Sequence, residues 1–177
     1  MQDTVLVIKT KSGDENSYGK LFSRYFKDIY AFLYLKVSSA DIAEDLASEA
    51  FLKVWQYIKS GKRIDNLRAL LYRTARNLAI DHHRKKKDAS LESADAVNVP
   101  DVGANIIKQI EAREQGAELQ KALLNIKEDY RDVLLLRYTQ ELSYKEIGQI
   151  LGKRSGAARV LVHRAQKELK KQMKGAV

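Results

Sequence analysis

The sequence predicts an all-α protein: two small helical domains joined by a flexible linker, the C-terminal one a four-helix helix-turn-helix domain. Apolar residues recur at helical spacing through most of the 177 residues, and no segment alternates like a strand. The single proline, Pro100, leaves long stretches free for helices. The stretch 88–105 holds four acidic residues, no lysine or arginine and no clean period, which is typical of a linker. We therefore expect domains at 1–87 and 106–177.

The first domain is predicted to be helical throughout. Apolar side chains recur every three or four residues in four segments, at about 3–11, 15–37, 40–59 and 66–86. Ser38 and Ser39 interrupt the pattern, and they can cap the helix that follows them. Gly61 marks the end of that helix.

The second domain shows the pattern of a helix-turn-helix. Its apolar periodicity predicts helices at about 106–126, 130–138, a short one between Ser143 and Gly152, and 155–174. Ser143 and Glu146 form a capping-box pattern, and Gly152 is placed to stop the short helix. A short capped helix, a glycine turn and a longer basic helix together predict the motif.

Charge indicates a polyanionic partner. The formal net charge is +9, and the basic residues gather in two blocks. Nine Lys and Arg lie between Lys62 and Lys87 against two acidic residues, and eight lie between Lys153 and Lys174 against one. Two separate basic blocks predict two contacts with one long polyanion, such as a nucleic acid.

Composition also excludes several classes of protein. There is no cysteine, so neither a disulfide framework nor a thiolate metal site can form, which fits a reducing cytoplasm. No apolar run reaches the ~18–20 residues of a membrane span, and the first eleven residues lack the apolar core of a signal peptide. No phosphate-binding loop, dinucleotide fingerprint or nucleophile motif is present. We expect a cytoplasmic protein with no cofactor, no metal and no enzymatic activity.

The last predicted helix has the composition that a major-groove helix needs. Its core side holds Ala158, Leu161, Val162, Ala165 and Leu169. The opposite side holds Gly156, Arg159, Val160, His163, Arg164 and Lys167. Arginine can pair with guanine and an exposed valine can meet a thymine methyl, while Ser155 and Gly156 let backbone amides approach phosphate. The alternative is an ordinary solvated cationic helix.

The helix at 66–86 carries a second basic face. Arg73, Asn77, Ile80 and Arg84 share one side, with Arg76 beside them. Residues 84–87 are all basic, so their like charges repel one another and destabilise the helix. Contact with phosphates would relieve this repulsion. A solvated charged face is again the alternative.

Three acidic residues, Asp41, Asp45 and Glu49, follow each other at i, i+4 and i+8 on the helix at 40–59. Such a row can be a solvated face, or it can contact a basic protein partner. A magnesium-dependent nuclease is a further alternative, but one row on one helix has no converging carboxylates.

These segments resemble the extracytoplasmic-function (ECF, or group IV) sigma factors of the sigma-70 superfamily. DIAEDLASEAFLKVW at 41–55 and NLRALLYRTARNLAIDHHR at 66–84 are similar to region 2 of that family. LSYKEIGQILG at 142–152 and SGAARVLVHRA at 155–165 are similar to region 4. The chain departs from the family pattern at Ser48, where glutamine is common, and at Leu70 and Leu71, where an aromatic residue is common.

The resemblance implies a role for each surface. The clamp helices of the largest polymerase subunit would bind Asp41, Asp45, Leu46 and Glu49. The minus-ten promoter element would be melted and read by Lys62, Arg63, Asn66, Arg73, Arg76, Asn77 and Arg84. The minus-thirty-five element would contact Arg154, Ser155, Gly156, Arg159, Val160, His163 and Arg164. The implied partners are bacterial core RNA polymerase, promoter DNA and an anti-sigma factor, and the free protein is expected to be a monomer without membrane insertion.

Two other functions remain open at the level of sequence. A stand-alone helix-turn-helix repressor would use residues 1–87 to dimerise or sense a ligand, and it would bind a palindrome. A helical scaffold or RNA-binding protein would need neither promoter nor polymerase. The second basic face argues against the repressor, because a dimerisation domain does not need one.

Overall fold

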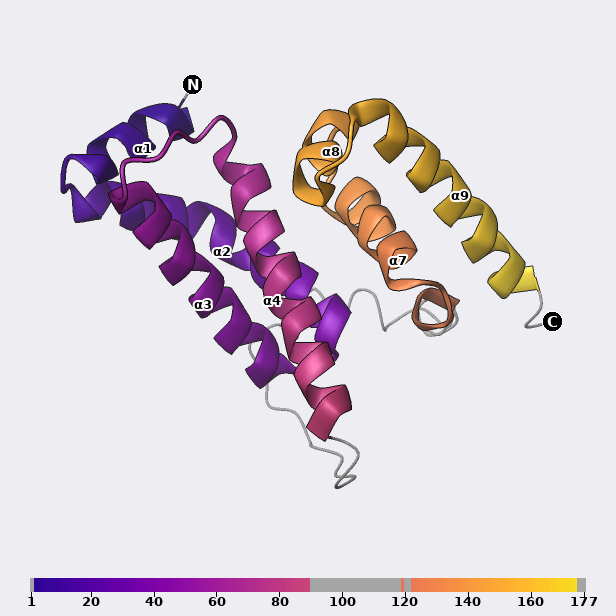
Figure 1. The fold of residues 1–177 in the computed structure, drawn as a ribbon. Helices are drawn as coiled ribbons and strands as arrows, with labels where there is room; N and C mark the ends of the chain where they lie inside the picture. The colour runs from indigo at the N-terminus through magenta and orange to yellow at the C-terminus, as the bar shows by residue number, and fades with distance from the viewer. Residues whose placement is uncertain (1, 90–118, 120–121, 175–177) are drawn as a thin grey trace. The chain divides into compact units, whose positions relative to one another are not determined.

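A computed structural model describes residues 2–89, 119 and 122–174 (Figure 1). The chain divides into two compact units, residues 1–101 and 102–177. Every regular element in the described ranges is a helix, which confirms the predicted all-α class. The predicted linker at 88–105 and the first helix of the second domain, predicted at 106–126, lie mostly outside the described residues, so their bounds stay predictions.

The first unit contains α1 (Gln2–Lys11), α2 (Glu15–Val37), α3 (Ala40–Lys59) and α4 (Leu67–Ala89). These bounds agree closely with the four predicted helices. The exception is the end of α4, which continues two residues past the predicted domain boundary at 87. Lysine and alanine are good helix formers, so the run 85–89 offers no stop signal.

Short-range bonds begin and end these helices. The Asp14 carboxylate caps α2 by accepting from the Ser17 amide at 3.2 Å and the Ser17 hydroxyl at 2.7 Å. Ser38 ends α2 in the left-handed region at φ 54°, while Ser39 holds the N-cap position of α3 without a side-chain capping bond. The two serines therefore separate the helices through backbone conformation. Asn66 caps α4, because its Oδ1 accepts from the Ala69 amide at 2.9 Å.

The core of the first unit forms where α2, α3 and α4 pack against one another. Phe32 of α2 meets Tyr72 of α4 edge to face, with ring centroids 5.4 Å apart, and both are fully buried. Buried alanines on α3 and α4 let the helices approach closely: Ala43, Ala47, Ala50, Ala75 and Ala79. Tyr18 of α2 donates to the carbonyl of Phe51 on α3. The outward sides of the helices are thus left free for other contacts.

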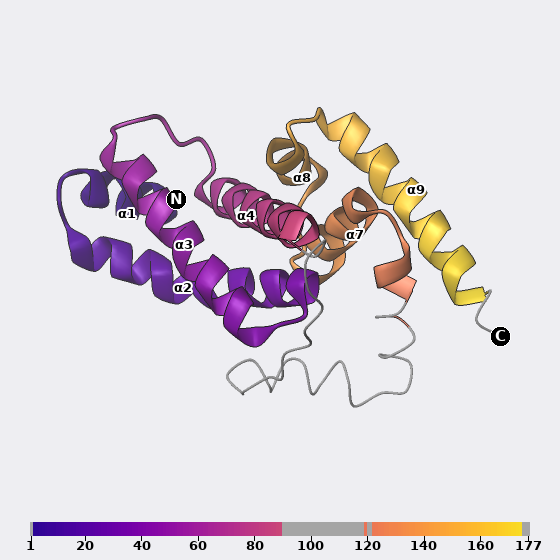
Figure 2. The same ribbon diagram turned by 60° about the horizontal axis from the view of Figure 1, so that its bottom comes forward.

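The second unit contains α7 (Glu128–Leu134), η1 (Leu135–Thr139), α8 (Tyr144–Leu151) and α9 (Ser155–Lys174). Figure 2 shows α9 alongside α7, with α8 near its N-terminal end. The predicted helix at 130–138 was wrong in detail: it begins two residues earlier, and its second half, η1, is a π-helix. Residues 132–136 are all buried, so the helix is enclosed on more than one side where α7 passes into η1.

The turn between α8 and α9 depends on two glycines. The predicted capping box is present, since Ser143 Oγ accepts from the Glu146 amide and Glu146 Oε2 accepts from the Ser143 amide. Gly152 ends α8 at φ 64°, in the left-handed region that favours glycine. Gly148 lies inside α8, and a Cβ there would stand 2.6 Å from the carbonyl oxygen of Lys153. That close approach sets where α9 begins.

Replacing Gly148 with alanine is expected to destabilise the second unit by about 1–3 kcal/mol, because the new Cβ would overlap the turn. Hydrogen exchange of the α8 and α9 amides measures the loss. Gly156→Ala is the matched control: a Cβ there meets no atom within 4 Å, so the same change should stabilise α9 by up to about 1 kcal/mol. Unchanged exchange in Gly148→Ala would contradict this account of the turn.

Candidate nucleic-acid interfaces and acidic face

The basic face of α9 is presented as the sequence predicted. Ala158, Val162 and Ala165 are at most 1% exposed and hold the helix on its unit. All seven predicted contact residues are exposed, and they lie in the turn or on the opposite side of α9: Arg154, Ser155, Gly156, Arg159, Val160, His163 and Arg164. Val160 is 50% exposed, an apolar side chain within a cationic surface. This surface can pair with bases and also meet a thymine methyl.

In the part of the chain that the structure describes, the cations of this face have no acidic partners of their own. Among the described residues, Arg154, Arg159 and Arg164 form no ion pair. The ion pair of α9, Lys171 to Glu168 at 3.9 Å, lies at the far end of the helix. The guanidinium groups near the N-terminus of α9 therefore keep their hydrogen-bonding capacity for an external anion.

The basic face of α4 also forms, as a row along one side. Arg73, Asn77 and Arg84 are exposed, and Arg76 beside them is half-buried. Arg73 and Arg84 are eleven residues apart, which is about 16 Å along an α-helix. The row is long enough to follow several nucleotides of a strand.

The loop at 61–66 lies at the N-terminal end of this row. Lys62 and Arg63 are exposed, and the Lys62 ammonium stands 5.5 Å from the centroid of the Tyr57 ring. Arg63 Nε bonds Asp65 Oδ1 at 2.7 Å, in a pair that stays open to solvent. Asn66, predicted as a DNA contact, uses its Oδ1 as the cap of α4. Sequence reasoning missed this capping role, although asparagine directly before a helix is the signal for it.

Other polar residues of α4 serve the fold. Arg68 stands over the ring of Tyr72 at 6.0 Å, and burial raises the pKa of the Tyr72 hydroxyl above its ordinary value. His82 and His83 are half-buried, and His83 Nε2 lies 3.2 Å from the carbonyl oxygen of Lys36. Burial, together with His83 and nearby lysines, lowers the pKa of His82. A neutral imidazole suits this packed position beside cations.

The acidic face of α3 is exposed on its predicted side. Asp41, Asp45 and Glu49 all reach solvent, and Glu49 pairs with Lys53 at 3.3 Å. Leu46, predicted as a contact, is only 8% exposed and belongs to the core. Leu52, which is 53% exposed, was not among the residues predicted from the sequence. At about 100° per residue it falls between Asp41 and Asp45 around the helix, so helical phase was the available signal.

The parts of the chain that the structure describes contain neither a metal-binding cluster nor a membrane-spanning helix. Those parts hold no group of three or more His, Cys, Asp or Glu that could bind a metal ion. They also hold no helix that is both long and apolar enough to cross a membrane.

Comparisons with known proteins match both units. The family models for Sigma-70 region 2 and Sigma-70, region 4 match residues 21–89 and 116–169. The ECF RNA polymerase sigma factor SigW of Bacillus subtilis (strain 168) is 30% identical over 175 residues, covering 94% of each chain. CnrH, solved in complex with the cytosolic domain of CnrY, has a TM-score of 0.76 at 18% identity and full coverage of both chains.

A second solved structure shows the same fold. The sigma factor RpoE in complex with the anti-sigma factor NepR from Bartonella quintana has a TM-score of 0.68 at 23% identity, covering 89% of this chain and 96% of that one. The relatives do not support a stand-alone repressor, because region 2 and region 4 occur together in one chain. The acidic face and both basic faces lie within the two matched regions. The chain belongs to the ECF family of RNA polymerase sigma factors.

Proposed function

We propose that this sigma factor directs core RNA polymerase to its promoters through three separate surfaces. The observation that carries the proposal is their separation: the acidic face of α3, the basic row of the loop and α4, and the basic face of α9 each lie on the exposed side of a different helix. A protein that binds both a basic protein and a polyanion needs surfaces of both signs. Nothing in this function requires the chain to carry out chemistry itself.

The acidic face is the proposed contact for the polymerase clamp helices. Exposed Asp41, Asp45 and Glu49 would meet a basic surface, and Leu52, on the same side at the C-terminal end of the row, would supply an apolar anchor beside them. Interfaces commonly place a buried apolar anchor inside a polar rim. Buried Leu46 then acts by fixing the position of α3.

The loop and α4 are the proposed minus-ten surface. Lys62, Arg63 and the exposed side chains of Arg73, Asn77 and Arg84 supply phosphate and base contacts to an opened strand. Arg76 would take part from its half-buried position beside the row. Asn66 would contribute through the shape of the loop, since it caps α4.

The face of α9 is the proposed minus-thirty-five surface. Helix-turn-helix proteins read bases with residues near the start of the recognition helix, where Arg159, Val160 and His163 lie. Arg154, Ser155 and Gly156 precede them and suit phosphate contacts. Arg164 extends the contact along the groove.

Partners and location follow from the same proposal. We expect the protein to act in the cytoplasm with core polymerase, to be a monomer when free and to be held inactive by an anti-sigma factor. The complexes solved for similar proteins support the last expectation. A binding experiment with each candidate anti-sigma protein, with core polymerase as competitor, tests it.

Changing Asp45 and Glu49 together to lysine is expected to weaken binding to core polymerase at least about tenfold, because like charges would then face each other. Titration with purified core measures the affinity, and circular dichroism should stay unchanged. Glu44→Lys is the control, since it makes a single charge reversal of the same kind on an exposed neighbour that points about 100° away from Asp45. Unchanged affinity in the double variant would mean that the acidic face is only solvated.

Shortening Leu52 to alanine tests the apolar anchor of the same face. Core affinity should fall about tenfold, since truncating an apolar anchor of an interface typically costs more than 1 kcal/mol. Stability should change by less than about 0.5 kcal/mol, because the side chain is exposed. Val5→Ala, on an equally exposed residue of α1, should leave core binding unaltered. Equal affinities for the two variants would remove Leu52 from the interface.

Changing Arg159 to alanine is expected to cost the holoenzyme about 1–3 kcal/mol on its promoter, with the loss confined to particular base pairs of the minus-thirty-five element. Competition binding with each of those base pairs altered in turn measures how the loss of affinity depends on the sequence. Lys170→Ala removes one exposed charge about 16 Å further along α9, and it should weaken all sequences slightly and equally. A uniform loss for Arg159→Ala would reduce that residue to a phosphate contact.

A further inference from the structure

Helix α1 lies outside the part of the chain that the region 2 model matches. The match covers residues 21–89, whereas α1 spans Gln2–Lys11. The helix is nevertheless fastened to the rest of its unit at both ends. None of the three proposed binding surfaces includes α1, so those surfaces do not explain why the helix is attached at both ends.

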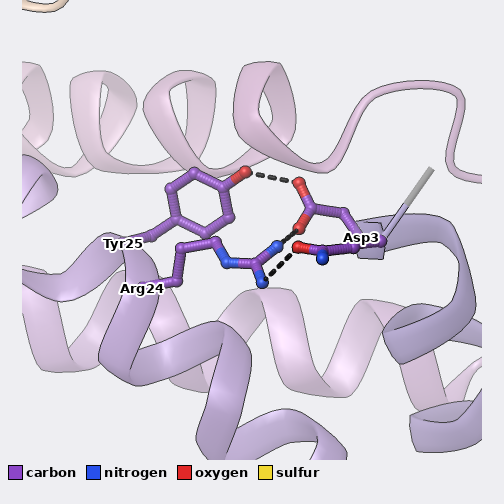
Figure 3. Close-up of polar contacts among 4 residues, drawn as sticks. Asp3, Arg24 and Tyr25 are labelled. Carbon is purple, nitrogen blue, oxygen red and sulfur yellow. Dashed lines mark hydrogen bonds and ion pairs between the residues drawn. The ribbon is translucent and has the colours of Figure 1, made fainter.

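The N-terminal end of α1 is tied to α2 through Asp3. Figure 3 shows its carboxylate accepting hydrogen bonds from the hydroxyl of Tyr25 and the guanidinium of Arg24. The same guanidinium also bonds Gln2 Oε1 at 3.1 Å. Burial, reinforced by the bond to Asp3, raises the pKa of Tyr25 to about 12, so the phenol stays a donor. This cluster fixes where α1 starts.

The middle of α1 packs on α2 and α3 through one side only. Val7 is 8% exposed and Thr10 is 1% exposed, and the Thr10 hydroxyl donates to the carbonyl of Leu6 at 2.8 Å. Val5 and Ile8 face outward, 50% and 58% exposed. The helix is therefore a docked element with a defined position.

The C-terminal end of α1 holds the loop that leads into α4. Lys11 Nζ donates to the carbonyl of Gly61 at 3.0 Å and to the carbonyl of Lys62 at 2.8 Å. Figure 1 shows this loop running beside α1. Gly61 has φ 76°, so the chain bends sharply at the first of the two carbonyls. One ammonium group thus fixes the loop where it leaves α3.

The loop faces α1 across a hollow at this place. A hollow of about 390 Å³ separates α1 from the loop, with Ile8 and Lys11 on one side and Arg63 and Ile64 on the other. Bonds within the loop, such as Arg63 to Asp65, span only a few residues and cannot fix its position relative to α1. The Lys11 bonds join residues about fifty positions apart in the sequence, and they connect α1 to the loop at the edge of the hollow.

We propose that Lys11 is a positioning residue for minus-ten recognition, and that α1 is a brace held at one end by Asp3 and bonded to the loop at the other. The inference rests on the proposed role of the loop and α4 as the minus-ten surface. Removing the bonds would let the loop sample other conformations, and affinity would fall with the fraction that keeps the competent one. The exposed carbonyls would turn to water, so the fold itself should survive.

The test compares Lys11→Met with Lys11→Arg and with Lys9→Met, which removes an exposed charge from the same helix. Each holoenzyme is titrated with a single-stranded minus-ten oligonucleotide selected by the parent holoenzyme from a random library. We expect Lys11→Met to bind about tenfold more weakly, equivalent to about 1.4 kcal/mol. Lys11→Arg, which restores a donor, and Lys9→Met should stay within about threefold of the parent. Core affinity and binding to minus-thirty-five duplex should not change.

Two further variants separate this inference from the function on which it rests. Asp3→Asn, which loosens the other end of the brace, should weaken oligonucleotide binding in the same direction as Lys11→Met, and amide exchange at 61–66 should quicken in both. Equal binding by Lys11→Met and Lys9→Met would overturn the role of Lys11, as would a parallel loss of core affinity. If Arg63→Ala with Arg73→Ala leaves oligonucleotide binding intact, the minus-ten surface itself is wrong.

Discussion

Helices α3, α4 and α9 each bury one side and expose the other, and this constraint separates the cores from the binding surfaces. On α3, Ala43, Ala50 and Val54 are at most 1% exposed, while the acids and Leu52 occupy the other side. On α9, the buried alanines leave the arginines to solvent in the same way. The packing that stabilises each unit therefore also decides which charges an external partner meets.

Helix bounds were predictable because their signals are local. Apolar spacing, the Ser143 capping box and the glycines Gly61 and Gly152 lie within the segments that they delimit, and α2, α3 and α9 match the predictions. The π-helical η1 was not predictable, since it begins within five successive buried residues, 132–136, whose burial is a tertiary property. The packing role of Gly148 was hidden for the same reason, because its close contact is with the turn that follows α8.

The candidate surfaces were predictable by helical phase, but the assignment of single residues was not. Charge and spacing placed Arg73, Asn77 and Arg159 on exposed faces, where they are found. Leu52 was missed because an apolar residue is ordinarily assigned to a core. The bond from Lys11 to the loop joins residues fifty positions apart, and no local sequence pattern predicts such a contact. The sequence thus predicted which helix faces are exposed, while the contacts that hold those faces in position are seen only in the structure.

The central claim is that one chain couples polymerase to two promoter elements. The most direct measurement is a selection from random DNA with the protein and purified core polymerase, followed by transcription of the recovered templates. The account predicts two sequence elements at a fixed spacing, with transcription starting downstream of the second, and recovery only when core is present. Recovery of a single palindromic element that the protein binds without polymerase would contradict it.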